Sequence, residues 1–139
     1  FLMSDEVWLV GAGKDAGLPT KISLKDLNAR PLVAYSASYP GFKRQFQSRL
    51  DKEKLFVNSV FESDNVGTLK RVVESGVGWG FLPAHSITKQ VKTRRLNHIH
   101  VEDMIYQTTI HLYTARSPGI KKMSEVFYRA IKNQILQLI

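Results

Sequence analysis

The chain has 139 residues, with 43% hydrophobic and 23% charged side chains, a composition typical of one globular domain and not of a disordered protein. It contains no cysteine, which excludes disulfide scaffolds, CxxC redox sites and cysteine-based zinc fingers. No apolar run reaches the roughly 18 to 20 residues of a membrane span, and no secretion signal opens the sequence. The chain starts at Phe1 and not at a methionine, so we interpret it as part of a longer protein.

The net charge of +8 raises the question of nucleic-acid binding. Most of the excess lies in residues 71–139, which carry ten Lys and Arg against four Asp and Glu. Its densest stretch contains four cations with no aromatic residue among them: Lys89, Lys92, Arg94 and Arg95. Single-strand binders interleave cations with stacking aromatics, and duplex readers align cations on a helix face. Neither pattern is present, so the stretch favours a solvated loop or a weak anion-facing patch.

The first third of the chain predicts two short strands and one helical turn. Residues 5–10 predict a strand that runs into a glycine pair, and a polar loop follows it up to Pro19. Ser23 and Asp26 predict one capped helical turn, and residues 32–35 predict a short apolar strand.

Two helices and a strand are predicted next. Pro40 favours the first turn of a helix over residues 40–52, because its missing N–H has no partner there in any case. Residues 55–61 predict a strand, and Gly76 predicts the left-handed end of the second helix. That helix has three candidate N-terminal caps: Ser63, Asp64 and Asn65.

The remaining elements complete an α/β pattern. Residues 77–82 predict a buried strand that ends before Pro83, and residues 105–114 alternate as expected for a long strand. Residues 119–138 carry apolar side chains at the three-and-four spacing of an amphipathic helix. Strands that alternate with helices imply a mainly parallel sheet flanked by helices, so the predicted fold class is α/β.

Two sequence patterns suggest chemistry but lack its usual context. Gly11–Ala16 fits the dinucleotide pattern GxGxxA, yet Gly17-Leu18-Pro19 interrupts any helix that could face a pyrophosphate. His98 and His100 lie on one side of an extended segment, but no spacing fixes the further ligands that zinc requires. Surface or half-buried histidines are therefore favoured. No GxSxG, HExxH or phosphate-loop motif occurs, so the motifs predict neither a catalytic residue nor a metal site.

Ligands of open parallel sheets bind beyond the carboxyl ends of the strands, where loops lead into helices. The predicted ends are Tyr35–Tyr39, Phe61–Asn65 and Pro83–Ser86. The first end offers the Ser36 and Ser38 hydroxyls, the Tyr39 ring and the free N–H groups of the following helix, which suit a carboxylate or similar anion. A structural role, with Ser38 as a cap and Tyr39 packed against the helix, is compatible with ligand contact.

The segment Glu74–Pro83, Glu-Ser-Gly-Val-Gly-Trp-Gly-Phe-Leu-Pro, with Val73 before it, resembles the "V-x-x-G-x-G-x-x-x-x-P" stretch of the regulatory domain of LysR-type transcriptional regulators. Asp5–Val10 is similar to the strand that enters the second subdomain of that family, and Ile22–Leu27 to its "sl-x-dL" turn. Tyr106–Thr114 is similar to the returning strand, and the last helix to the family's C-terminal helix.

The resemblance implies a truncated, periplasmic-binding-protein-like (type 2) lobe. Residues 1–139 would form a partial effector-binding domain, with the second subdomain over about 12–104, crossing strands at 5–10 and 105–114, and residues 118–138 as the C-terminal helix of an otherwise missing first subdomain. An inducer would lie between the lobes, in contact with Tyr35, Ser36, Ser38 and Tyr39, with Phe61, Glu62 and Ser63 beside it. Two departures bear on the inducer's identity: Trp79 replaces a smaller aliphatic residue, and the loop after Gly11 lacks a His-Pro pair.

The family implies the partners as well. We expect a bacterial, cytoplasmic, homo-oligomeric regulator that binds a small-molecule inducer, needs no cofactor and has no membrane partner. It would bind DNA only through an N-terminal helix-turn-helix missing from this chain, with RNA polymerase as a further contact of the parent protein. The alternatives are a substrate-binding lobe of a transport-type solute-binding protein, which shares the architecture, and an enzyme lobe.

Overall fold

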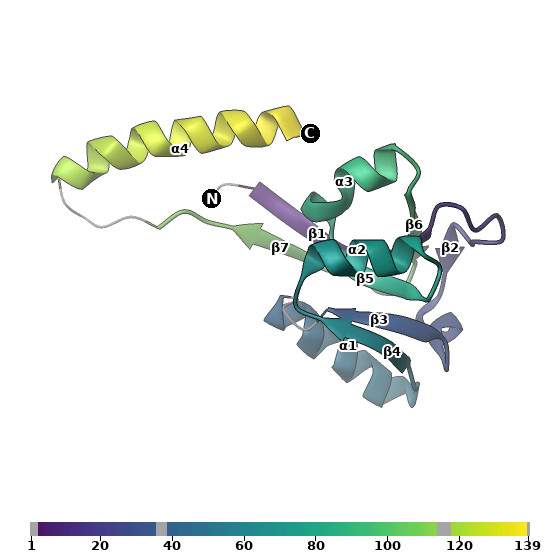
Figure 1. Ribbon diagram of the computed structural model, residues 1–139. Coiled ribbons are helices and arrows are strands. Elements are labelled where there is room, and N and C mark those ends of the chain that lie inside the picture. Colours follow the sequence, from purple (N-terminus) through teal and green to yellow (C-terminus); the bar gives the residue numbers. More distant parts are fainter. Residues whose placement is uncertain (1–2, 36–38, 114–117, 139) are drawn as a thin grey trace. The chain divides into compact units, whose positions relative to one another are not determined.

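The computed structural model describes residues 3–35, 39–113 and 118–138. The chain divides into two compact units, Glu6–Tyr106 and Phe1–Asp5 with Gln107–Ile139. The larger unit contains most of the sheet, and the smaller one contains the last strand and the C-terminal helix (Figure 1).

Seven strands form one sheet in the order β2-β6-β1-β5-β3-β4, and β7 pairs with β1. β3 pairs in parallel with β4 and β5, and β2 pairs in parallel with β6, whereas β1 is antiparallel to β5 and β6. The predicted α/β class with a mainly parallel sheet is therefore confirmed. The strands are β1 (Met3–Ala12), β2 (Lys21–Ile22), β3 (Pro31–Tyr35), β4 (Asn58–Ser63), β5 (Trp79–Pro83), β6 (Leu96–Val101) and β7 (Gln107–Ile110).

Helices cover both faces of the sheet in the larger unit (Figure 1). Successive residues of β1 point to opposite faces, so Leu9 packs in one apolar cluster and Val10 in the other. Leu9 shares its cluster with Phe42 of α1, whereas Val10 shares its cluster with Leu69 of α2 and Ile87 of α3. The helices are η1 (Leu24–Leu27), α1 (Pro40–Glu53), α2 (Val66–Glu74), α3 (Ala84–Lys92) and, in the smaller unit, α4 (Pro118–Leu138).

Several local predictions are confirmed. Pro40 begins α1, and Gly76 follows α2 with a φ of 87°. Of the three candidate caps of α2, Asn65 takes the role, since its side chain accepts a hydrogen bond from the Thr68 N–H at 3.1 Å. The C-terminal helix spans almost the predicted range. Among the helices of the described ranges, none combines the length and the apolar composition that a membrane span requires.

The basic stretch is not a loop throughout, so the prediction of a solvated loop is wrong for Lys89 and Lys92, while the alternative of a weak anion-facing patch stays a prediction. Lys89 and Lys92 belong to α3, which begins directly after Pro83. Ile87 is fully buried and Val91 packs against the same cluster one turn later, so two apolar residues suffice to hold the helix on the sheet. Arg94, with a φ of 60°, then ends the helix and turns the chain into β6.

The largest differences between predicted and observed strand boundaries concern two strands. The strand predicted over residues 55–61 is observed over residues 58–63, because Lys54 turns left-handed with a φ of 54° and the Leu55 N–H bonds the Leu50 carbonyl to close α1. The strand predicted over residues 105–114 is regular only as β7; residues 111–113 are irregular, and Thr114 lies outside the described residues.

We expect Asn65→Ala to lower the free energy of unfolding by about 1 kcal/mol, because the N–H of Thr68 loses its acceptor at the start of α2. Asp64→Ala is the matched control, since the exposed Asp64 precedes the cap and we expect it to cost only a few tenths of a kcal/mol. Urea denaturation measures both values, and equal losses for the two variants would contradict the assignment of the cap.

Candidate functional site

Three helices begin at one edge of the sheet in the larger unit. β3, β4 and β5 run parallel, so their carboxyl ends lie at the same edge, and each leads into a helix, α1, α2 or α3. The first N–H groups of a helix have no partner within it, and they carry a partial positive charge. This edge therefore presents hydrogen-bond donors and positive potential to any ligand placed beyond it.

The structure brings together two of the predicted segments that are distant in sequence. Tyr35 at the end of β3 pairs with Ser63 at the end of β4, and Ala34 pairs with Glu62. Ser36 and Ser38 lie outside the described residues, although the segment that contains them joins β3 to α1. The predicted ligand contacts thus share one edge of the sheet wherever they are described.

Tyr39 occupies the position before the first residue of α1. Its ring packs against the apolar cluster of α1 and stacks with Tyr106, with 6.4 Å between the ring centroids. The Tyr106 hydroxyl lies against the first turn of α1, because a Cβ added at Gly41 would be only 2.5 Å from it. The sequence gives no indication of this role for Tyr106, which it places only at the start of a returning strand.

A groove of about 440 Å³ lies between α1 and the strands β3, β4 and β5. Three aromatic side chains line it, Phe42, Phe46 and Phe81, and Lys43 and Glu62 contribute the charged part of its lining. Of the predicted site residues, Glu62 is the one that lines this groove among those described. The groove suits a ligand that has an apolar body and one polar or charged end.

Phe61 and Ser63 have other surroundings. Phe61 faces the opposite side of the sheet from Glu62, because successive residues of a strand alternate in direction. The Ser63 hydroxyl oxygen accepts a hydrogen bond from the Asn65 N–H at 3.0 Å, which shapes the turn into α2. The three flanking candidates are therefore close in the chain but are not presented to one common surface.

The glycine pair after the first strand has a packing role. β1 continues through Ala12 into a turn, and no helix begins in the described stretch Gly11–Ala16. A Cβ at Gly11 would lie 2.5 Å from Leu18 Cδ1, and a Cβ at Gly13 would collide with the Arg94 carbonyl oxygen. These glycines permit close contact between chain segments, and the geometry lacks the helix N-terminus that a dinucleotide site needs.

His98 belongs to a stack of rings on β1 and β6. It lies parallel to Trp8, with 4.3 Å between ring centroids, and 4.1 Å from His100. Trp8 Nε1 donates a hydrogen bond to Glu6 Oε2 at 2.6 Å. The pKa of His98 is lowered to about 4, chiefly by burial and to a smaller extent by the neighbouring His100, while Glu6 opposes the shift. Among the residues that the structure describes, no three His, Cys, Asp or Glu side chains converge to hold a metal.

One family model matches almost the whole chain. The profile of the LysR substrate binding domain matches residues 2–135. No curated protein matches the chain. Similar solved structures cover 95% of this chain and include the regulatory domain of the HypT M206Q mutant from Salmonella typhimurium, with 19% identity, 74% of its chain covered and a TM-score of 0.62.

Two further neighbours carry a small molecule in their descriptions. The Synechocystis PCC6803 CcmR regulatory domain in complex with 2-PG has 14% identity and a TM-score of 0.66, with 65% of its chain covered. The effector binding domain of QuiR in complex with shikimate has 16% identity and a TM-score of 0.62, with 64% of its chain covered. At these identities the likeness shows the fold, and the chain spans about two thirds of the length of these domains.

We expect the folded protein to lose stability as the pH falls from about 6.5 toward 4, and His98→Gln to reduce that loss. Since the folded pKa of His98 is about 4 against an ordinary 6.5, the unfolded chain binds more protons in this window. For a half-buried ring, screened by solvent, we expect a contribution of about 1 kcal/mol at pH 5.

Urea denaturation at pH 7 and pH 5 measures this difference. His85→Gln, at an exposed position of α3 outside the ring stack, is the matched control for replacing a histidine by glutamine. A His98→Gln variant that loses as much stability as the unmodified chain would refute the assignment.

Proposed function

The chain belongs to the LysR substrate-binding domain family, and we propose that it is the inducer-sensing part of a LysR-type transcriptional regulator that binds a small anionic molecule between two lobes. The family match over residues 2–135 is the observation that carries this proposal. The family is one of regulatory domains, and we propose no catalytic role for this chain.

We assign the larger unit to the second subdomain of the regulator. Its boundaries, at Glu6 and Tyr106, lie close to the crossing strands expected at 5–10 and 105–114. In this assignment α4 is the C-terminal helix of the first subdomain. Its exposed apolar side chains support the assignment because such a face normally packs against a partner: Met123, Val126 and Phe127.

The inducer in this proposal lies at the carboxyl ends of β3, β4 and β5. The starts of α1, α2 and α3 supply N–H donors there, which favour a carboxylate or a similar anion. We propose contacts with the Tyr35–Tyr39 segment and, from β4, with Phe61, Glu62 and Ser63. Because Phe61 and Glu62 alternate in direction, Glu62 is the candidate of the two that lines the groove beside α1. The ligands in the descriptions of CcmR and QuiR, 2-PG and shikimate, support a small molecule.

The inducer acts, in this proposal, by changing the arrangement of the two lobes in a cytoplasmic homo-oligomer. A ligand shifts such an equilibrium only by the difference between its affinities for the two arrangements. In this proposal a helix-turn-helix in another part of the parent protein binds DNA, and the parent protein also contacts RNA polymerase. The parent reading frame separates this proposal from a transport-type solute-binding lobe, since the first requires a helix-turn-helix upstream and the second a secretion signal.

We expect Ser36→Ala combined with Ser38→Ala to weaken inducer binding by about 1 to 3 kcal/mol while the fold stays intact, because polar groups of the ligand lose their partners. A thermal-shift panel of small organic carboxylates on the full-length regulator identifies the inducer, and calorimetry measures its affinity for each variant. Ser48→Ala, at an exposed position of α1, is the control. Unchanged affinity in the double variant would show that this segment is not the site.

We expect this chain on its own to bind DNA without sequence specificity. Its net charge of +8 supports only salt-sensitive contact with phosphates. Gel shifts with operator and scrambled duplexes at physiological salt measure the ratio of affinities. A preference for the operator that persists at that salt concentration would place a DNA-reading element inside this chain.

A further inference from the structure

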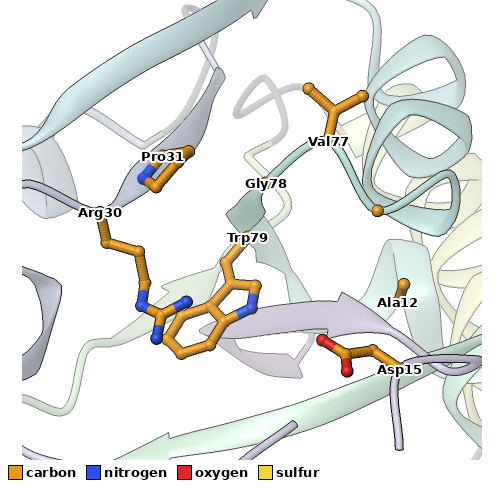
Figure 2. A pocket seen from close by; sticks show the side chains of 8 residues that line it. Ala12, Asp15, Arg30, Pro31, Val77, Gly78 and Trp79 are labelled. Carbon is orange, nitrogen blue, oxygen red and sulfur yellow. The ribbon is translucent and has the colours of Figure 1, made fainter. Parts of the chain in front are cut away.

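A second pocket lies at the opposite end of the sheet, where β3 and β5 begin and β1 ends (Figure 2). Its volume is about 160 Å³, and its lining includes Ala12, Asp15, Arg30, Pro31, Val77 and Trp79. β3 and β5 run from this pocket toward the proposed inducer edge, a distance of about 13 Å for strands of this length. None of the described residues proposed for the inducer lines it.

The Arg30 guanidinium lies over the indole of Trp79, with its central carbon 3.8 Å from the ring centroid (Figure 2). Trp79 is only 7% exposed and belongs to the apolar cluster of α1, so it is a fixed platform for the cation. Stacking uses the face of a guanidinium and leaves the N–H groups in its plane available. Within the described ranges, no acceptor bonds the Arg30 guanidinium.

Residues from other parts of the chain bring further cations to the end of the sheet that holds this pocket. The Lys14 side chain lies beside Gly76, since a Cβ there would be 3.9 Å from Lys14 Cε. The Gly13 N–H donates to the Arg95 carbonyl at 2.9 Å, which ties the turn after α3, with Arg94 and Arg95, to the end of β1. In the part of the chain that the structure describes, no ion pair joins Arg30 or these three further cations to a carboxylate.

One carboxylate opposes this positive charge. Asp15 lines the pocket, and its Oδ1 accepts a hydrogen bond from the Gly17 N–H at 3.0 Å. Figure 2 shows the indole nitrogen of Trp79 on the side of Asp15, so the pocket wall carries a second N–H donor next to Arg30. Arg30 and Asp15 are the charged residues of the lining, Lys14 lies next to its Gly76, and the space that they border holds only a few waters.

We propose that this pocket binds a small oxyanion, a carboxylate, phosphate or sulfate group, through the guanidinium of Arg30. A guanidinium fork matches the paired oxygens of such groups, and the fixed Trp79 ring holds the fork in place before the ligand arrives. The site is separate from the inducer edge, and it accounts for cations that the proposed function does not use.

Tryptophan fluorescence tests the proposal directly. The chain has two tryptophans, so Trp8→Phe leaves Trp79 as the only emitter. We titrate this full-chain variant with sodium phosphate, sulfate and acetate, with chloride keeping the ionic strength constant. A saturable change in Trp79 emission with at least one of the three anions is expected, and their order of affinity distinguishes a carboxylate site from a phosphate or sulfate site. No saturable change with any of them would overturn the proposal.

Three variants in the Trp8→Phe background locate the site. Arg30→Gln should weaken binding by about tenfold or more, because it removes the charge-assisted bonds. Asp15→Asn keeps the oxygen that accepts the Gly17 N–H and removes the opposing charge, so binding should tighten about threefold. Arg44→Gln, on the exposed surface of α1, should change nothing.

Circular dichroism confirms that each variant is folded. Equal affinities in the Arg30→Gln and Arg44→Gln variants, or weaker binding in Asp15→Asn, would refute the assignment to this pocket. Because the two sites lie at opposite ends of the sheet, failure here leaves the inducer proposal standing, and failure at Ser36 and Ser38 leaves this one standing.

Discussion

The parallel pairing of β3 with β4 and β5 is the constraint on which the rest of the larger unit depends. Parallel neighbours cannot be joined by a tight turn, so the chain crosses over the sheet in helices. All three strands therefore end at one edge, where α1, α2 and α3 begin, and start at the other edge, beside Arg30 and Trp79. The parallel pairing thus produces one edge of the sheet with free N–H donors at the starts of the helices. At the other edge, donors for a ligand have to come from side chains such as that of Arg30.

β1 joins the two layers that this pairing creates. As an antiparallel strand between β5 and β6, it places Leu9 in the cluster under α1 and Val10 in the cluster under α2 and α3. Each cluster is closed by a helix that follows a parallel strand. The small residues at the end of β1 allow the Leu18 and Arg94 segments to approach the backbone closely. The same strand, β1, therefore determines the packing of both apolar clusters and the close approach of chain segments at the end of the sheet that holds the Arg30 pocket.

Local signals in the sequence predict the elements that depend on local chemistry. Pro40, Asn65 and Gly76 mark helix ends because each satisfies or removes a backbone group within its own turn. α3 is missed because only Ile87 and Val91 pack it on the sheet, which is too weak a periodic signal beside its polar residues. The start of β4 is misplaced because Lys54, a non-glycine residue, adopts the left-handed conformation. The edge proposed for the inducer could be predicted, because it follows from the order of strands and helices. The contacts of Tyr106 and the contact of Arg30 with Trp79 could not, because they join residues far apart in sequence.

These long-range contacts determine where the positive charges of the chain lie in the fold. Counted along the sequence, the excess of cations belongs to the second half, yet Lys14 and Arg30 of the first half lie at the same end of the sheet as Arg94 and Arg95. An anion held there would join the loop after β1, the turn before β5 and the start of β3, and would stabilise the fold by mass action. It would alter inducer affinity only if the anion's own affinity differs between the two arrangements of the lobes, since coupling between two sites is reciprocal.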